Sequence, residues 1–253
     1  MKAAIPNLLT ATNLFCGMLA LLFVGTGAVV PASIALAVAL VMDFADGFVA
    51  RLLRVSSEIG KQLDSLADCV TFGVVPGFIM ARMIHTSLGG TFPPERLFDL
   101  PGLPWYLAGF LIAVFSALRL ARFNLDTRQH DAFYGVPTPA NTLLVLSCWL
   151  IQAWHPMHPL ARALEHSWLL VVLSVVLSLL LVADIRLIAL KFHGYGWRGN
   201  EARYLLIATA LLLLLAFRIV GIPFVFLSYL VLSLADNLRT ARTRSSQPSN
   251  TDL

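Results

Sequence analysis

Long apolar runs separated by short polar stretches dominate the chain. We predict that eight of them are membrane-crossing helices, because each approaches the roughly 20 residues that a helix needs to span the hydrocarbon core. The expected spans are residues 8–29, 32–52, 63–85, 104–122, 138–154, 167–185, 203–218 and 220–237. Glycine and proline mark the breaks, as at Gly27 and Pro31. The pattern predicts an all-α, polytopic transmembrane helix bundle.

The composition supports a membrane protein and argues against a soluble one. Hydrophobic residues make up 58% of the chain and charged residues only 13%, whereas soluble domains average about 25% charged residues. Basic residues do not form a patch with interleaved aromatic residues, so we expect no nucleic-acid partner. We expect membrane lipid to surround the protein.

Four carboxylates interrupt the apolar pattern within one stretch of chain, at Asp43, Asp46, Asp64 and Asp68. On helices, spacings of three and four residues place the members of each pair on one face. Carboxylates that repel one another at a membrane surface also lose hydration, which is unfavourable unless cations neutralise them. Oxygen ligands without Cys or His favour hard ions, so we predict a site for one or two Mg²⁺ or Mn²⁺ ions.

Positive charges predict how the spans are oriented, because they collect on the cytoplasmic side of membrane proteins. We place the N-terminus in the cytoplasm. The cytoplasmic segments then hold all of the 18 lysines and arginines except Arg82, Arg96, Arg162 and Arg218. This bias predicts that both termini and the acidic stretch face the cytoplasm.

The residues around the two acidic pairs follow the pattern D-x2-D-G-x2-A-R-x8-G-x3-D-x3-D. Its small residues, Gly47, Ala50 and Gly60, allow backbones and a flat ligand to approach closely. Arg51 follows Gly47 by one helical turn, so its guanidinium could hold a phosphate through two hydrogen bonds. The pattern therefore indicates a site for a phosphorylated ligand.

The chain resembles the CDP-alcohol phosphatidyltransferase family, whose signature this pattern matches in full. The integral membrane enzymes of this family move a phosphatidyl group from a CDP-linked lipid to an alcohol and release CMP. The resemblance implies a six-helix core with its site at the cytoplasmic interface, in a homodimer. The core would cover about residues 1–186, and two C-terminal transmembrane helices at about 203–238 would complete a single catalytic domain. Residues 239–253 would form a polar, disordered cytoplasmic tail.

Three further stretches resemble the branch of the family that uses serine. They are IPNLLTATNLFCGMLA near the N-terminus, SLADCVTFGVVPG at residues 65–77 and ALRLARFN at residues 117–124. The resemblance implies that CDP-diacylglycerol and L-serine are the substrates, and that phosphatidylserine and CMP are the products, in phospholipid biosynthesis. Eight spans, two more than the common core, also fit this branch.

The resemblance also assigns roles to single positions. Asp43, Asp46 and Asp64 would bind the metal, and Asp68 would combine metal contact with the role of general base. A serine hydroxyl is a poor nucleophile until such a base accepts its proton. The residues expected to contact the CDP-lipid are Asn7, Thr10, Gly47, Arg51, Ser57 and Gly60.

Arg119 and Arg122 lie three residues apart at the end of the fourth predicted span, so they share one helix face. They could anchor the helix end at the membrane surface. Alternatively, they could bind the carboxylate of serine or a substrate phosphate, because charges within membrane helices are usually functional. Together with the resemblance, this favours the substrate role.

Other functions stay open from the sequence. The same chemistry could use glycerol 3-phosphate, inositol phosphate or choline, although a phosphorylated acceptor would favour more cations near the site. A transporter that uses the carboxylates as an ion path is the alternative from another class. The clustering of the carboxylates at one membrane face argues against it. The lack of a cleavable signal and the compact chain predict a location in a prokaryotic plasma membrane.

Overall fold

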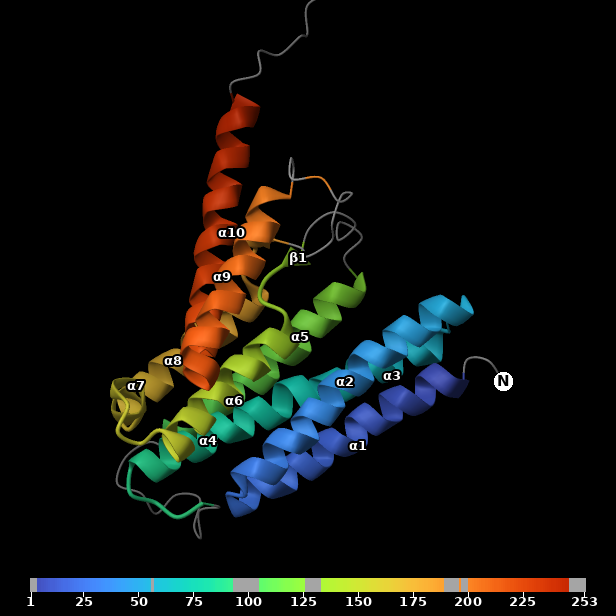
Figure 1. The fold of residues 1–253 in the computed structure, drawn as a ribbon. Coiled ribbons are helices and arrows are strands. Elements are labelled where there is room, and N and C mark those ends of the chain that lie inside the picture. Colours follow the sequence, from blue (N-terminus) through green and yellow to red (C-terminus); the bar gives the residue numbers. More distant parts are fainter. Residues whose placement is uncertain are drawn as a thin grey trace, which may run out of the picture. The chain divides into compact units, whose positions relative to one another are not determined.

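The structure is a computed structural model that describes residues 4–55, 57–92, 105–125, 133–188, 196 and 200–245. It divides into two compact units, which are described separately (Figure 1). Unit 1 comprises residues 1–125 and 137–182, and unit 2 comprises residues 126–136 and 183–253.

Unit 1 begins with two long helices that pack extensively against each other, α1 (Ala4–Thr26) and α2 (Val29–Leu53). The chain reverses between them at Gly27, whose φ of 77° is left-handed. Glycine adopts this conformation readily because it has no side chain. The reversal places α2 beside α1 (Figure 1), and the side chains of Thr10 and Asp46 meet between the two helices.

A continuous helical segment follows, made of α3 (Glu58–Asp68), η1 (Cys69–Val74) and α4 (Val75–Ser87). The middle part, η1, is a π-helical turn that begins directly after Asp68. Such turns inside helices are frequent at functional sites. The interruption therefore lies next to one of the predicted site residues.

The rest of unit 1 surrounds α4, which packs against α1, α5, α6 and α8. Its elements are η2 (Trp105–Phe110), α5 (Leu111–Leu125), α6 (Thr138–Trp154), α7 (Pro159–Leu164) and α8 (Ser167–Val182). Most side chains of α4 are buried. Small residues allow close packing here, because a Cβ on Gly77 would lie only 3.1 Å from the carbonyl oxygen of Gly109. The core of unit 1 is therefore centred on α4.

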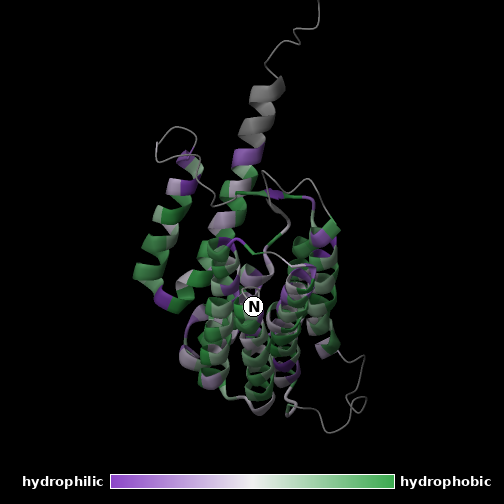
Figure 2. Ribbon diagram, turned by 90° about the vertical axis from the view of Figure 1, so that its right-hand side faces the viewer, coloured by the Kyte–Doolittle hydropathy of each residue, from purple (hydrophilic) through white to green (hydrophobic). Residues whose placement is uncertain are grey.

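Hydrophobic residues predominate along the helices, as Figure 2 shows, and many of them are exposed. Large apolar side chains such as Leu8, Phe44 and Leu52 are about 70% exposed, which is typical of a surface that faces lipid. Five segments of the described residues are long and apolar enough to cross a membrane. They are Ala4–Thr26, Val29–Leu53, Glu58–Ser87, Trp105–Leu125 and Glu201–Asn237.

Unit 2 contains a helical hairpin and a short β-ladder. The hairpin consists of α9 (Glu201–Phe217), η3 (Arg218–Val220) and α10 (Gly221–Ser245), and its two long helices pack against each other. The segment Glu201–Asn237 therefore holds two of the predicted spans. In the ladder, β1 (Phe133–Tyr134) pairs antiparallel with β2 (Arg186–Leu187), with Phe133 opposite Leu187.

The predicted all-helical architecture is confirmed, with the two-residue ladder as the one exception among the described residues. The count of eight membrane spans is not established, because α6 and α8 have only 17 and 16 residues and a span typically needs about 20. The division into a six-helix core and two added spans of one catalytic domain stays a prediction.

The predicted disordered tail is wrong for residues 239–245, because α10 continues to Ser245. The sequence there, RTARTRS, contains arginine and alanine, which favour continuation of a helix. The rest of the predicted tail, at residues 246–253, lies outside the described residues.

Candidate active site

Three of the four aspartates form one group within unit 1. Asp43 comes from α2, whereas Asp64 and Asp68 come from α3. One carboxylate oxygen from each of these residues lies within 4.8 Å of the other two. The carboxyl groups of Asp43 and Asp68 are within hydrogen-bonding reach of each other. All three residues are partly buried, so solvent screens their mutual repulsion only incompletely.

The donor set of this group fits a divalent cation. Its ligand atoms are carboxylate oxygens, which hard ions such as Mg²⁺ and Mn²⁺ prefer. Three carboxylates so close together repel one another, and a cation would remove that repulsion. The Asp43, Asp64 and Asp68 group could therefore hold an ion.

Asp46 has a different environment from the other three aspartates. It is buried on α2, and its Oδ2 accepts a hydrogen bond of 2.5 Å from the Thr10 hydroxyl of α1. Thr10 is also buried, so this contact connects the two helices inside unit 1. The four aspartates thus do not form one equivalent set: three form the carboxylate group, and Asp46 is oriented by a threonine.

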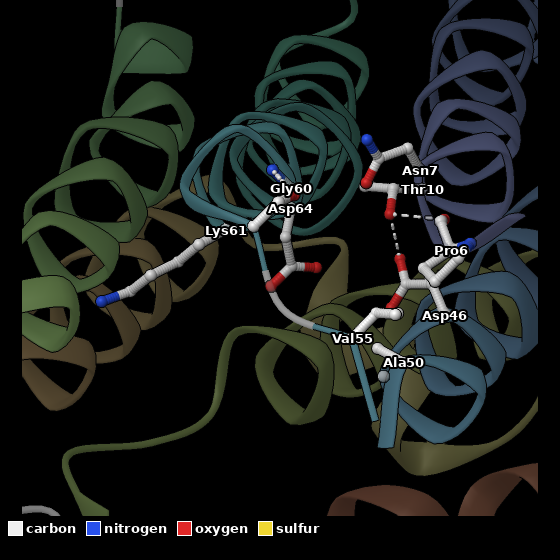
Figure 3. A pocket seen from close by; sticks show the side chains of 11 residues that line it. Pro6, Asn7, Thr10, Asp46, Ala50, Val55, Gly60, Lys61 and Asp64 are labelled. Atoms are coloured by element: carbon white, nitrogen blue, oxygen red, sulfur yellow. Dashed lines mark hydrogen bonds between the residues drawn. The ribbon is translucent and has the colours of Figure 1, made fainter. Parts of the chain in front are cut away.

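A pocket of about 320 Å³ opens between α1, α2 and the start of α3 (Figure 3). This volume falls within the range of small-molecule sites, about 300–1,000 Å³. The lining residues are Pro6, Asn7, Thr10, Asp46, Gly47, Ala50, Val55, Ser57, Gly60, Lys61 and Asp64. The structure therefore brings together most of the residues expected to contact the CDP-lipid and two of the predicted metal ligands.

The first turn of α3 gives this pocket a favourable environment for an anion. Ser57 caps the helix, because its Oγ accepts a 3.0 Å hydrogen bond from the Gly60 amide. The positive end of the helix dipole favours negative charge at this pocket, whereas the Lys61 ammonium points away from it to the Asn124 carbonyl. A Cβ on Gly60 would lie 2.9 Å from Asn7 Oδ1 and from Ser57 Oγ. Glycine therefore keeps this part of the pocket open.

The arginines predicted to bind substrate do not line this pocket. Arg51 is exposed, and its Nη2 would lie 4.0 Å from a Cβ built on Gly47, so it lies close to the pocket wall. Arg122 donates a 3.3 Å hydrogen bond to the carbonyl of Val182, the last residue of α8. Arg119 lies on α5 together with Arg122 and is partly buried. Their role in binding serine stays a prediction.

Two asparagines near the aspartates make polar contacts that were not expected from the sequence. Asn13, on α1, donates a 3.3 Å hydrogen bond from Nδ2 to Asp68 Oδ1. At the end of α5, Asn124 donates to Ser65 Oγ at 2.8 Å and accepts from Lys61 Nζ at 3.4 Å. Figure 3 shows Lys61 extending from α3 towards α5. The sequence contained one indication that Asn13 belongs to the site. It follows Thr10 by three residues, so the two side chains lie on the same helix face.

Comparisons with known proteins agree with this site. A sequence model described as CDP-alcohol phosphatidyltransferase matches residues 3–180. The chain is 34% identical over 183 residues to the CDP-diacylglycerol–serine O-phosphatidyltransferase of Helicobacter pylori strain 26695, covering 72% of this chain and 70% of that protein. The enzyme of the same name from Mycobacterium tuberculosis H37Rv is 30% identical over 219 residues, which cover 82% of this chain and 68% of that protein. The one from Bacillus subtilis is 31% identical over 135 residues, which cover 53% and 69%.

Proposed function

The chain belongs to the CDP-alcohol phosphatidyltransferase family, and from this premise we propose that it transfers the phosphatidyl group of CDP-diacylglycerol to the hydroxyl of L-serine and releases CMP. The observation that carries this proposal is the group of Asp43, Asp64 and Asp68 beside an anion-favouring pocket. Asp64 belongs to both, so the carboxylates adjoin the place where a nucleotide diphosphate would bind. The choice of L-serine as the acceptor rests on the relatives named CDP-diacylglycerol–serine O-phosphatidyltransferase.

The pocket binds the CDP part of the lipid. Asn7 and Thr10 approach it from α1, and Gly47 provides a flat wall on α2. Ser57 and Gly60 contribute the first turn of α3, where the helix dipole favours the diphosphate. Arg51, one turn beyond Gly47, adds a positive charge near the wall.

The carboxylate group would hold Mg²⁺ or Mn²⁺, as one or two ions, with Asp46 available at the pocket as a further ligand. A bound ion supplies charge neutralisation for the diphosphate and for the departing CMP. The protein contributes the fixed positions of its carboxylates on adjoining helices. Thr10 orients Asp46 by its hydrogen bond, and the pocket keeps the diphosphate beside the carboxylates.

Asp68 acts as the general base in this proposal. The serine hydroxyl oxygen attacks the phosphorus that bears the diacylglycerol, and the bond from this phosphorus to the CMP oxygen breaks. The hydroxyl proton passes to a carboxylate oxygen of Asp68. CMP leaves with the electron pair of the broken bond, so the step needs no oxidant or covalent enzyme intermediate.

Arg119 and Arg122 bind the carboxylate of serine in this proposal. Arg122 uses one nitrogen for the Val182 carbonyl, and a guanidinium has five N–H donors. Asn124, two residues later on α5, contacts Ser65 and Lys61 of α3. This end of α5 is therefore attached to the helix that carries Asp64 and Asp68.

The protein is a multi-pass membrane protein, by its apolar helices and its family. Within that frame, we propose that it lies in a cell membrane with its active site and both termini in the cytoplasm. The distribution of lysine and arginine supports this orientation. A homodimer is proposed from the family resemblance alone.

The function is tested with purified protein in detergent and CDP-diacylglycerol. CMP release is measured with Mn²⁺ and, in separate reactions, L-serine, glycerol 3-phosphate, inositol phosphate or choline. If L-serine is the only acceptor that gives CMP release, the proposal is supported. If only one of the other acceptors gives CMP release, that acceptor is the substrate and serine is not. Absence of CMP release, together with ion flux in proteoliposomes, would instead support a transporter.

A further inference from the structure

We propose that Asn13 is a positioning residue for this reaction, which holds the carboxyl group of Asp68 in its working orientation. The inference rests on the proposed function, because it assigns Asn13 a purpose in serine transfer. It does not depend on which ion is bound.

The contact between Asn13 and Asp68 connects residues that are far apart in the sequence. The Asn13 side chain is fully buried on α1, and its Nδ2 lies 3.3 Å from Asp68 Oδ1. Only the amide nitrogen of an asparagine can face a carboxylate, because the amide oxygen and the carboxylate are both acceptors. The hydrogen bond therefore fixes which end of the Asn13 amide faces Asp68.

A second hydrogen bond fixes α1 against the turn that follows Asp68. The hydroxyl of Thr71, in η1, donates to the backbone carbonyl of Asn13 at 3.3 Å. Gly17, one turn later on α1, also lies against Thr71, because a Cβ at Gly17 would lie 3.1 Å from the Thr71 Cα. Asn13 thus belongs to a tightly packed contact, and its amide is held where Asp68 ends α3.

Packing alone does not explain an asparagine at this position. Its Oδ1 is buried and has no hydrogen-bond partner among the described residues. A buried carbonyl without a partner destabilises a fold, whereas an apolar side chain of similar size avoids that cost. The favourable contact of Asn13 is the one to Asp68, which restricts rotation of a carboxyl group that also faces Asp43.

The test replaces Asn13 with leucine, which has a similar size and no donor. We expect kcat for serine transfer to fall about 10- to 100-fold, the usual effect of losing a group that orients a metal ligand. The KM for CDP-diacylglycerol should stay within about twofold, because Asn13 does not line the pocket. The melting temperature should be unchanged or higher. Thr12→Val is the matched control, because Thr12 is only partly buried and its hydroxyl donates to the carbonyl of Leu8 on its own helix.

Asn13→Val provides a second variant that also removes the donor, and it carries the test if the leucine variant does not fold. It should also lower kcat. A kcat within twofold of wild type in either folded variant would overturn the proposal. A lowered melting temperature with an increased KM for CDP-diacylglycerol would instead show a purely structural role.

A measurement without turnover separates this inference from the proposed function. Mn²⁺ should raise the melting temperature of the wild type, and Asn13→Leu should reduce that rise. In an Asp68→Asn background, Asn13→Leu should cause no further reduction, because Asn13 acts only through Asp68. If Asn13→Leu reduced the Mn²⁺-induced rise in melting temperature equally in the wild type and in the Asp68→Asn background, the inference would be contradicted. Wild-type protein that is inactive with serine would refute the function and leave this comparison valid.

Discussion

The hydrogen bond between Thr10 and Asp46 gives a quantitative prediction. Replacing Thr10 with valine keeps the shape of the side chain and removes the hydroxyl that donates to Asp46 Oδ2 at 2.5 Å. Asp46 is only 6% exposed, so water cannot readily replace the lost donor. The carboxylate then loses its fixed direction at the wall of the pocket.

The expected size of the effect follows from the charge of the acceptor. A hydrogen bond to a charged group contributes about 1.5–3 kcal/mol, and each 1.36 kcal/mol changes a rate about tenfold. If Asp46 contributes this orientation to catalysis, kcat/KM for CDP-diacylglycerol should fall about 10- to 150-fold. Valine fills nearly the same volume as threonine, so the variant should still fold.

The assay is steady-state CMP release at saturating serine with varied CDP-diacylglycerol. Thr12→Val is again the matched control, because it removes a hydroxyl from the same helix without any contact to a carboxylate. The control should keep kcat/KM within about twofold of wild type. If Thr10→Val did the same, the contact with Asp46 would have no role in the site.

Four other substitutions test separate parts of the site. Asp68→Asn should abolish CMP release while CDP-diacylglycerol still binds, measured by equilibrium binding, and normal turnover would end its role as base. Gly60→Ala should raise the KM for CDP-diacylglycerol several-fold, because its Cβ would enter the pocket; Gly25→Ala, whose Cβ meets only one atom at 4.0 Å, should not. Arg119→Ala and Arg122→Ala should raise the KM for serine, and an unchanged KM in both would exclude carboxylate binding.

The helices were largely predictable because hydrophobic run length is a local property. Helix α1 nevertheless starts at Ala4, earlier than the predicted residue 8. Pro6 lies in its first turn, where proline is tolerated because the missing N–H would have no helical partner. Membrane crossing was less predictable, since α6 and α8 are apolar but short.

The sequence predicted which residues belong to the candidate site better than it predicted how these residues contact one another. The spacing of Asp64 and Asp68 indicated that they share a helix face, and both belong to the carboxylate group. The spacings could not show that Asp46 bonds to Thr10 while Asp43 joins Asp64 and Asp68, because these contacts depend on how α1, α2 and α3 pack.

Asn13 illustrates what a local pattern leaves undetermined. Within an apolar run, a single asparagine has no partner that can be identified from its neighbours. Its contact with Asp68 spans 55 positions, and it forms only once α1 packs against α3 and η1. The end of α5 is similar, because Asn124 reaches Ser65 across 59 positions.

The proposed metal site is tested most directly by anomalous diffraction from crystals grown with Mn²⁺ and CDP-diacylglycerol. We predict a manganese peak between the carboxylates of Asp43, Asp64 and Asp68, in contact with the diphosphate of the lipid. Crystals of an active preparation that show the lipid without a peak at these carboxylates, or with manganese bound elsewhere, would contradict the prediction.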